Sequence, residues 1–207
     1  MQVGEGGLRE RHKAQRRIRI LEAARELLRD SPESALSTER IAARAEVAPA
    51  TVYNLIGPRD KIWEALAVGF MDELERRLAV LGADDPREVV RSTVLLFVDD
   101  PVVSRRMVRE WEESGLVLDR SPLTQLRRAL ADARTRGLLR ADIDTDALAS
   151  VVGTSCVGAL HQWVAALIDD DRFLARALFA LDVALAAAAA DPYRDQLLAP
   201  LRIRGAE

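Results

Sequence analysis

Apolar residues recur every three to four positions along most of this chain, and that spacing is typical of amphipathic helices. Beyond the N-terminal region, the stripes predict helices over 60–81, 86–98, 101–114, 121–136, 145–168 and 171–190. Runs of alternating β-branched residues joined by Asn-Gly or Gly-Gly turns are missing from the sequence, so we expect essentially no sheet. The chain is therefore predicted to be all-α.

Residues 37–56 carry the strongest functional signal, since they predict two short helices on either side of a tight turn. Ser37 is a suitable N-cap for the first helix. The turn falls at Glu46 and Val47, and Pro49 then fits the first turn of a new helix because its missing N–H needs no intrahelical partner. This is the layout of a DNA-reading helix-turn-helix. An ordinary helical hairpin with a solvated polar face is the alternative for this segment alone.

The second short helix places polar side chains close to its start. Thr51, Tyr53 and Asn54 fall within about two turns of that start, and such hydroxyls and amides can contact phosphates and base edges. Basic residues precede the segment and form an arm: Arg9, Arg11, Lys13, Arg16, Arg17 and Arg19. Two more, Arg59 and Lys61, follow it. A basic cluster taken alone is more often a solvated surface than a DNA contact.

Residues 16–66 resemble the N-terminal domain of the TetR family of transcriptional regulators. Four segments carry the resemblance: IleLeuGluAlaAlaArgGluLeuLeu at 20–28, IleAlaAlaArgAla at 41–45, ThrValTyr at 51–53 and GlyProArgAspLys at 57–61. Their order and spacing match over about fifty residues. The resemblance implies that Thr51, Tyr53 and Asn54 face DNA and that Arg59 binds a phosphate. The complete set of expected DNA-contacting residues is Arg17, Ser37, Thr38, Pro49, Ala50, Thr51, Tyr53, Asn54, Arg59 and Lys61.

Some positions depart from the family pattern. Glu46 stands where the family usually has glycine, so it must either adopt a left-handed conformation at some cost or change the turn. Ala48 replaces the usual hydroxyl cap of the second helix. These departures keep open an alternative, a helical small-molecule-binding protein or enzyme whose DNA-reading head has decayed. A further alternative is the same fold acting without an effector, or as an activator.

The charge is distributed unevenly between two expected domains. The net charge of −3 would oppose binding to DNA, which is itself an anion. Residues 1–64 carry 12 Lys and Arg against 10 Asp and Glu, net +2, whereas residues 65–207 carry 18 against 23, net −5. We expect a DNA-binding domain of three helices with its basic arm over 1–64, and a larger helical domain for effector binding and dimerisation over 65–207.

Residues that could catalyse a reaction or hold a metal are few and scattered. His12 lies among the basic residues, His161 lies in a late helix, and Cys156 is the lone cysteine. We therefore expect no catalytic residues, no metal and no cofactor. One cysteine fits a reducing compartment, so we expect a cytoplasmic protein. We also expect no membrane contact, because no uncharged apolar run stands out as long enough to span a bilayer.

The two last long helices, 145–168 and 171–190, are the expected dimer interface, because members of the TetR family pair through their last two long helices. Small residues that would allow close helix approach in the first of them include Ala149, Gly153, Ser155, Cys156, Gly158 and Ala159. The apolar stripe of the second consists of Phe173, Ala177, Ala180, Leu181, Ala184, Leu185 and Ala188. Burial of both stripes within one subunit is the alternative. A two-fold dimer would imply a palindromic operator in double-stranded DNA.

Apolar and aromatic residues of the middle helices could enclose a small-molecule effector. The residues expected to line that site are Phe97, Met107, Trp111, Leu126 and Trp163. For each of them ordinary core packing is an alternative. The sequence thus predicts a homodimeric regulator, a repressor that releases its operator when an effector of unknown identity binds.

Overall fold

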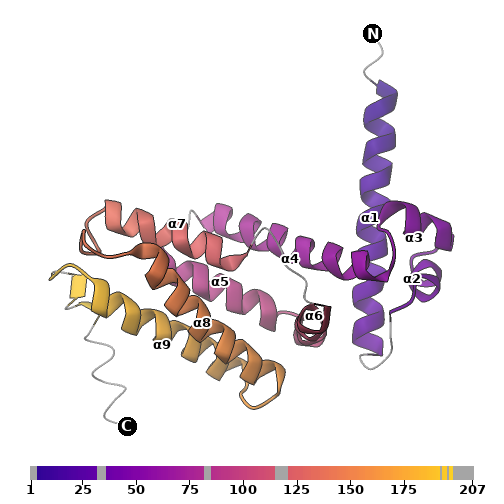
Figure 1. Ribbon diagram of the computed structural model, residues 1–207. Coiled ribbons are helices and arrows are strands. Elements are labelled where there is room, and N and C mark those ends of the chain that lie inside the picture. Colours follow the sequence, from indigo (N-terminus) through magenta and orange to yellow (C-terminus); the bar gives the residue numbers. More distant parts are fainter. Residues whose placement is uncertain are drawn as a thin grey trace. The chain divides into compact units, whose positions relative to one another are not determined.

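The computed structural model describes residues 4–31, 36–81, 85–114, 121–191, 193–194 and 196–197. Within these ranges the chain forms nine named α-helices (Figure 1). They are α1 (Gly4–Asp30), α2 (Thr38–Arg44), α3 (Pro49–Leu55), α4 (Arg59–Leu81), α5 (Pro86–Val98), α6 (Pro101–Ser114), α7 (Pro122–Thr135), α8 (Thr145–Val164) and α9 (Asp170–Ala188). The predicted all-α class is confirmed. In the described part of the chain, the nearest approach to a sheet is one isolated antiparallel bridge between Leu139 and Ala189.

The chain divides into two compact units. The first unit comprises Met1–Phe70 and Asp100–Leu118, and so contains α1 to α3, the first half of α4, and α6. The second comprises Met71–Asp99 and Asp119–Glu207, with the rest of α4, α5 and α7 to α9. The expected assignment of roles to 1–64 and 65–207 stays a prediction.

The core of the first unit is built on the inward stripe of α1. Ile20, Ile41 and Val52 come from α1, α2 and α3 in turn, and each is 0% exposed. Their burial follows from the three-to-four spacing of apolar residues, which puts one side of each helix against its neighbours. Because α3 has only seven residues, the burial of Val52 is its main anchor in this core.

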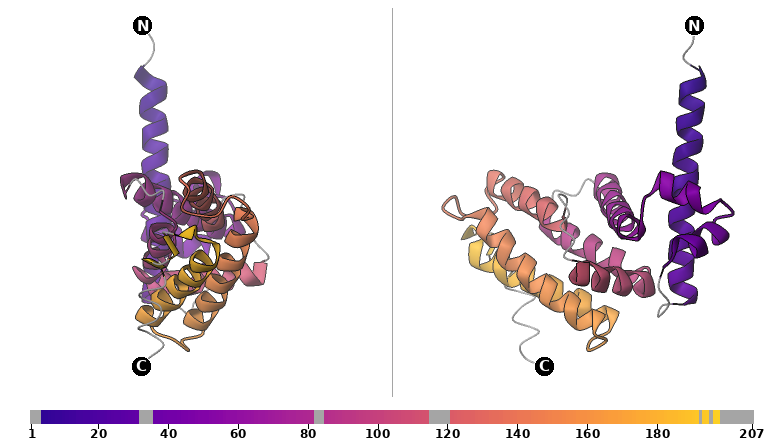
Figure 2. Two further views of the ribbon diagram at one scale, coloured as in Figure 1. Left: turned by 90° about the vertical axis from the view of Figure 1, so that its left-hand side faces the viewer. Right: turned by 45° about the vertical axis from the view of Figure 1, so that its right-hand side comes forward.

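The second unit is built around a group of aromatic rings. Trp163 of α8 stacks on Phe173 of α9 with 5.4 Å between ring centroids, and Phe97 of α5 packs against both. The Trp163 indole N–H donates to Asp170 Oδ1 at 2.6 Å, so its one polar atom is satisfied although the side chain is fully buried. Figure 2 shows α8 and α9 running side by side in both views. This pair of helices therefore forms one layer of the unit.

One helix ends earlier than expected. The sequence predicts a helix over 145–168, but α8 stops at Val164, where the Leu167 N–H bonds to Gln162 O and the Ala166 N–H to Trp163 O. Ala166 has a φ of 57°, so the chain leaves the helix through the left-handed residue of a Schellman motif. That turn lets the chain reverse and start α9 at Asp170.

Candidate functional site

The segment from Ser37 to Leu55 folds as a helix, a tight turn and a second helix. The Ser37 side chain accepts a hydrogen bond from the Arg40 N–H at 3.2 Å, which confirms the predicted N-cap of α2. At the turn, Glu46 has a φ of 53° and the Val47 N–H bonds to Ala42 O at 2.9 Å. Of the two possibilities for Glu46, the chain takes the left-handed one and keeps a Schellman turn without glycine.

The second helix of this motif, α3, begins at Pro49 as predicted. Its N-cap, Ala48, makes no side-chain hydrogen bond, so the departure from a hydroxyl cap does remove one acceptor. The Ala48 carbonyl still accepts from the Thr51 N–H at 2.8 Å and closes the first turn. The loss of the cap therefore leaves the helix intact.

The outward side of α3 carries the side chains that were expected to face DNA. Tyr53 is 61% exposed, Asn54 is also exposed, and Thr51 is half-buried. Pro49 and Ala50 are exposed at the start of the helix. A phenol, an amide and a hydroxyl are thus presented together on one short helix, and these groups can donate to phosphates and base edges. At the start of α2, the other expected contacts, Ser37 and Thr38, are half-buried.

The basic arm is part of a helix. Helix α1 begins at Gly4, and residues 9–19 are all exposed, so the cationic side chains surround a helical segment that continues into the core at Ile20. A surface hollow on this segment is lined by His12, Gln15, Arg16 and Arg19. Arg17 reaches a different helix, because its Nη1 donates to the Leu55 carbonyl of α3 at 2.7 Å.

The two cations that follow the motif both have carboxylate partners. Arg59, at the start of α4, donates from Nη2 to Glu110 Oε1 of α6 at 3.1 Å. Glu110 is 8% exposed and also accepts from Arg106 at 2.7 Å. Lys61 pairs with Glu64, and that hydrogen bond raises the pKa of the lysine. A DNA phosphate would compete with these carboxylates for Arg59 and Lys61, which the sequence did not indicate.

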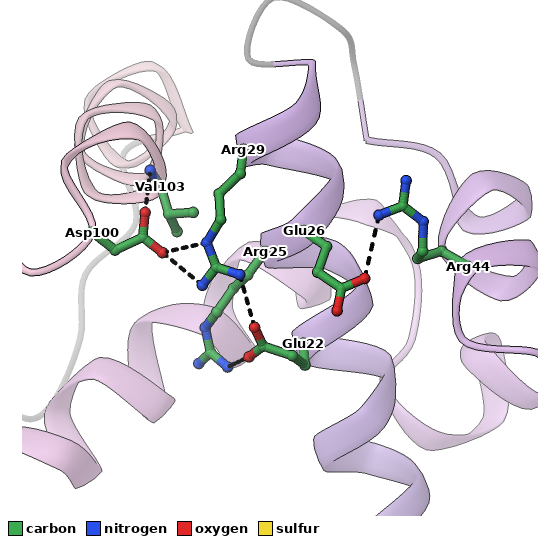
Figure 3. Close-up of polar contacts among 7 residues, drawn as sticks. All are labelled: Glu22, Arg25, Glu26, Arg29, Arg44, Asp100 and Val103. Atoms are coloured by element: carbon green, nitrogen blue, oxygen red, sulfur yellow. Dashed lines mark hydrogen bonds and ion pairs between the residues drawn. The ribbon is translucent and has the colours of Figure 1, made fainter.

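A network of ion pairs ties α1 to α6 (Figure 3). Arg29 Nη2 lies 2.7 Å from Asp100 Oδ2, and Arg29 Nη1 lies 2.9 Å from Glu22 Oε1. Glu22 also accepts from Arg25 at 3.2 Å. Partial burial alone would raise the pKa of Glu22, but the hydrogen bonds from Arg29 and Arg25 lower it. The C-terminal half of α1 is therefore held by charge as well as by packing.

A second set of ion pairs ties α2 to α1. Arg44 Nη1 donates to Glu26 Oε2 at 3.2 Å, as drawn in Figure 3, and Arg44 Nη2 donates to Asp30 Oδ2 at 2.7 Å. Each exposed pair contributes little to stability by itself. Together they fix the end of α2, and with it the turn that leads into α3.

The residues expected to line an effector site are divided between the two units. In the first unit, Met107 is 3% exposed, and Trp111 packs edge-on against Phe70 with 6.4 Å between ring centroids. In the second unit, Phe97 and Trp163 belong to the aromatic group described above, and Leu126 is 4% exposed. The sequence missed Phe70 and Phe173 as ring partners. Effector contact by these side chains stays a prediction.

The predicted apolar stripe of α9 is largely internal. Its buried members are Phe173, Ala177, Leu181, Leu185 and Ala188. The prediction that this stripe forms part of the dimer interface is therefore wrong, because these five side chains fill the core of their own subunit. A different side of the same helix exposes Phe179 at 46% and Val183 at 47%.

Helix α8 also exposes an apolar side. Val151 is 61% exposed and Val157 is 50% exposed. Gly158 follows Val157, and a methyl group added at its Cα would meet no other heavy atom within 4 Å beyond its chain neighbours and the backbone of its own helix. A hydrogen bond between Arg176 of α9 and Gln162 of α8 joins the exposed sides of the two helices. By length and composition α8 is long and apolar enough to cross a bilayer, so the expectation that no run is long enough is wrong on that measure; 28% of its apolar window is buried.

In the residues that the structure describes, no group of three or more His, Cys, Asp or Glu side chains is arranged to hold a metal ion. Burial raises the pKa of the Cys156 thiol to about 11. This thiol is therefore protonated and unreactive at neutral pH.

Comparison with known proteins gives matches to both the motif and the fold. Residues 20–55 match the family model described as bacterial regulatory proteins of the tetR family. The chain is similar to the structure of SmeT, the repressor of the Stenotrophomonas maltophilia multidrug efflux pump SmeDEF, at 27% identity and a TM-score of 0.60 over 84% of this chain and 91% of SmeT. No curated protein sequence matches the chain significantly.

Two further solved structures share the fold. One is a complex of SmeT with triclosan, at 24% identity and a TM-score of 0.59, covering 86% of this chain and 93% of the other. The second comes from work on the molecular basis for control of antibiotic production by bacterial hormones, at 24% identity and a TM-score of 0.64, covering 84% and 97%. The likeness extends over nearly the whole of each chain, so both units share it.

Proposed function

We propose that this chain, which matches the tetR family model over residues 20–55 and shares its fold with SmeT, is a TetR-family regulator that represses transcription by occupying a palindromic operator as a homodimer. The observation that carries the proposal is the exposed outer side of α3, where Thr51, Tyr53 and Asn54 stand on a correctly formed helix-turn-helix. The remaining proposed contacts lie around it: Ser37, Thr38, Pro49, Ala50, Arg59 and Lys61. The larger helical part, residues 65–207, would bind the effector and form the dimer.

The left-handed conformation of Glu46 helps to decide between a DNA-binding protein and the alternative, a small-molecule-binding protein or enzyme whose DNA-reading head has decayed. A residue that could not replace glycine in the turn would change the angle between α2 and α3. The Schellman hydrogen bonds are instead formed, and Val52 is fully buried behind α3. The geometry therefore supports a working reader, and the acid at Glu46 would affect its affinity more than its shape.

We propose that the homodimer forms through the exposed sides of α8 and α9. Val151 and Val157 on α8 and Phe179 and Val183 on α9 are apolar side chains that a second copy would remove from water. Such burial also accounts for the apolar character of α8. A two-fold axis through these helices would present two reading heads to successive major grooves, about 34 Å apart.

Release of the operator would follow effector binding. The repressor SmeT and a complex of SmeT with triclosan share this fold, which supports a small-molecule ligand for this chain too. The effector needs to favour a dimer whose reading heads no longer match the groove spacing. A tenfold loss of operator affinity requires only about 1.4 kcal/mol of differential binding. We further propose a cytoplasmic location and no catalytic activity, as for a protein that acts on DNA by binding.

The test is selection of bound sequences from a random pool of duplex DNA at moderate salt. We expect the purified protein to enrich a palindrome, and Thr51→Ala with Tyr53→Ala to abolish that enrichment. Tyr193→Ala is the matched control, since Tyr193 is the other tyrosine of the sequence and lies in the second unit. No enriched sequence with the unaltered protein, or enrichment that survives both α3 substitutions, would overturn the proposal and favour the decayed head.

A further inference from the structure

The side chain of Arg17 joins the first helix to the end of the reading helix. Its Nη1 donates to the carbonyl oxygen of Leu55 at 2.7 Å, across 38 positions of sequence. Leu55 is the last residue of α3. The last four carbonyls of any α-helix lack an intrahelical donor, so the guanidinium satisfies an acceptor that the helix itself leaves open.

The reading helix has few other means of holding its orientation. It spans seven residues, it lacks a side-chain N-cap at Ala48, and Val52 is its one buried side chain. Helices of this length are not stable on their own in water. A positive group at the C-terminus interacts favourably with the helix dipole, and a charge-assisted hydrogen bond is stronger than a neutral one. The Arg17 contact therefore acts on the least supported part of the reading head.

The helix that carries Arg17 is itself well anchored. Ile20, three residues after Arg17, is fully buried, and the same helix is tied to α6 through Arg29 and Asp100 and to α2 through Arg44. A guanidinium carried by α1 can fix the position of α3, because α1 is anchored by contacts of its own. Arg17 thus connects a rigid element with a short one.

We propose that Arg17 is a positioning residue that sets the orientation of α3 and thereby the sequence selectivity of the protein, rather than a phosphate contact. The inference rests on the proposed function as a DNA reader. A phosphate contact would strengthen binding to all DNA equally, whereas a residue that orients α3 changes which bases its side chains reach. The two roles therefore differ in what they do to specificity and in what they do to the protein without DNA.

The first experiment measures amide hydrogen exchange of residues 52–56 in the full-length protein without DNA. We expect Arg17→Gln to accelerate this exchange roughly tenfold, since a hydrogen bond to a charged group is lost. Arg16→Gln, the same change one position earlier on the same helix, should leave it unaltered. Unchanged exchange in Arg17→Gln would overturn the proposal, because a phosphate contact has no effect before DNA binds.

The second experiment compares base preference and salt dependence of the same variants. We expect Arg17→Gln to broaden the selected palindrome while the slope of log K against log salt stays that of the unaltered protein. A phosphate contact from each of two protomers would instead reduce that slope by roughly 1.8. Arg17→Lys keeps the charge but not the planar guanidinium, so it should also broaden the preference.

The outcomes separate this inference from the proposed function. If the unaltered protein enriches no sequence, the proposed function fails and the exchange experiment still decides whether Arg17 positions α3. If the unaltered protein enriches a palindrome and Arg17→Gln lowers affinity uniformly with a shallower salt slope, Arg17 is a phosphate contact and the inference alone is overturned.

Discussion

Substitution of Val151 by aspartate tests the proposed dimer interface directly. Val151 is 61% exposed on α8, so the change disturbs little of the subunit's own core. If a second copy covers this side chain, the variant must bury a carboxylate where the unaltered protein buries a valine. We therefore expect Val151→Asp to fold normally and to be largely monomeric.

The magnitude follows from the exposed fraction. Full burial of a valine is worth roughly 2 kcal/mol, so covering the 61% that is exposed contributes about 1.2 kcal/mol in each subunit and about 2.4 kcal/mol per dimer. Desolvating an unpaired carboxylate costs several kcal/mol more for each subunit. The lost valine burial alone, about 2.4 kcal/mol, raises the dissociation constant roughly 60-fold, and the two unpaired carboxylates raise it by about three or more further powers of ten.

The assay is sedimentation velocity or light scattering over a wide range of protein concentrations, with helical content and thermal unfolding as checks on the fold. Val80→Asp is the matched control, since Val80 is 76% exposed near the end of α4, outside the two helices of the proposed interface, and should leave association unchanged. A Val151→Asp protein that dimerises as strongly as the unaltered one would show that α8 is not the interface. An unaltered protein that stays monomeric at every concentration would refute the dimer itself.

Three further results are expected. Glu46→Gly should raise the thermal unfolding midpoint, because it removes about 1 kcal/mol of left-handed strain, whereas Glu46→Ala removes the charge but keeps the strain and should not. Hydrogen bonds from Arg76 and Arg77 lower the pKa of Glu73 from 4.5 to about 2, so its stabilising effect is complete above pH 4.5 and is lost between pH 4.5 and pH 2. Glu73→Gln should therefore lower the unfolding temperature at pH 7, and equal midpoints at that pH would contradict the pairing. Alkylation of Cys156 at pH 8 should be roughly 100-fold slower than that of a thiol with an ordinary pKa of 9.0, and rapid labelling would show that the thiol is not buried.

Most of the helices were predictable because they are apolar on one side, and the periodicity of the sequence reports that side directly. The expected ranges 86–98 and 101–114 coincide with α5 and α6. The early end of α8 was missed because its left-handed residue is Ala166, and no glycine marks the position. The inner side of α9 was misassigned since the helix is apolar on more than one side, and a sequence does not show which side its own subunit covers.

The candidate site was predictable in its local parts and not in its long-range pairs. The Ser37 cap and the position of the turn follow from residues within one short segment. The contacts of Arg17 with Leu55 and of Arg59 with Glu110 join residues 38 and 51 positions apart, and many other acceptors would have served as well by sequence alone. Only the packing of the helices selects these partners.

The N-terminal part of α1 is a helical segment that no core packing supports. Residues 9–16 are exposed, and they precede both the Arg17–Leu55 contact and the core that begins at Ile20, so their helical form rests on local hydrogen bonds. Such a segment, nucleated at one end by a folded helix, unwinds gradually on heating rather than in a cooperative transition. Ordering it again on a DNA surface would release heat and cost entropy, a cost that grows as the segment unwinds. If this arm contacts DNA, that contact should therefore weaken on warming while the two cores are still folded.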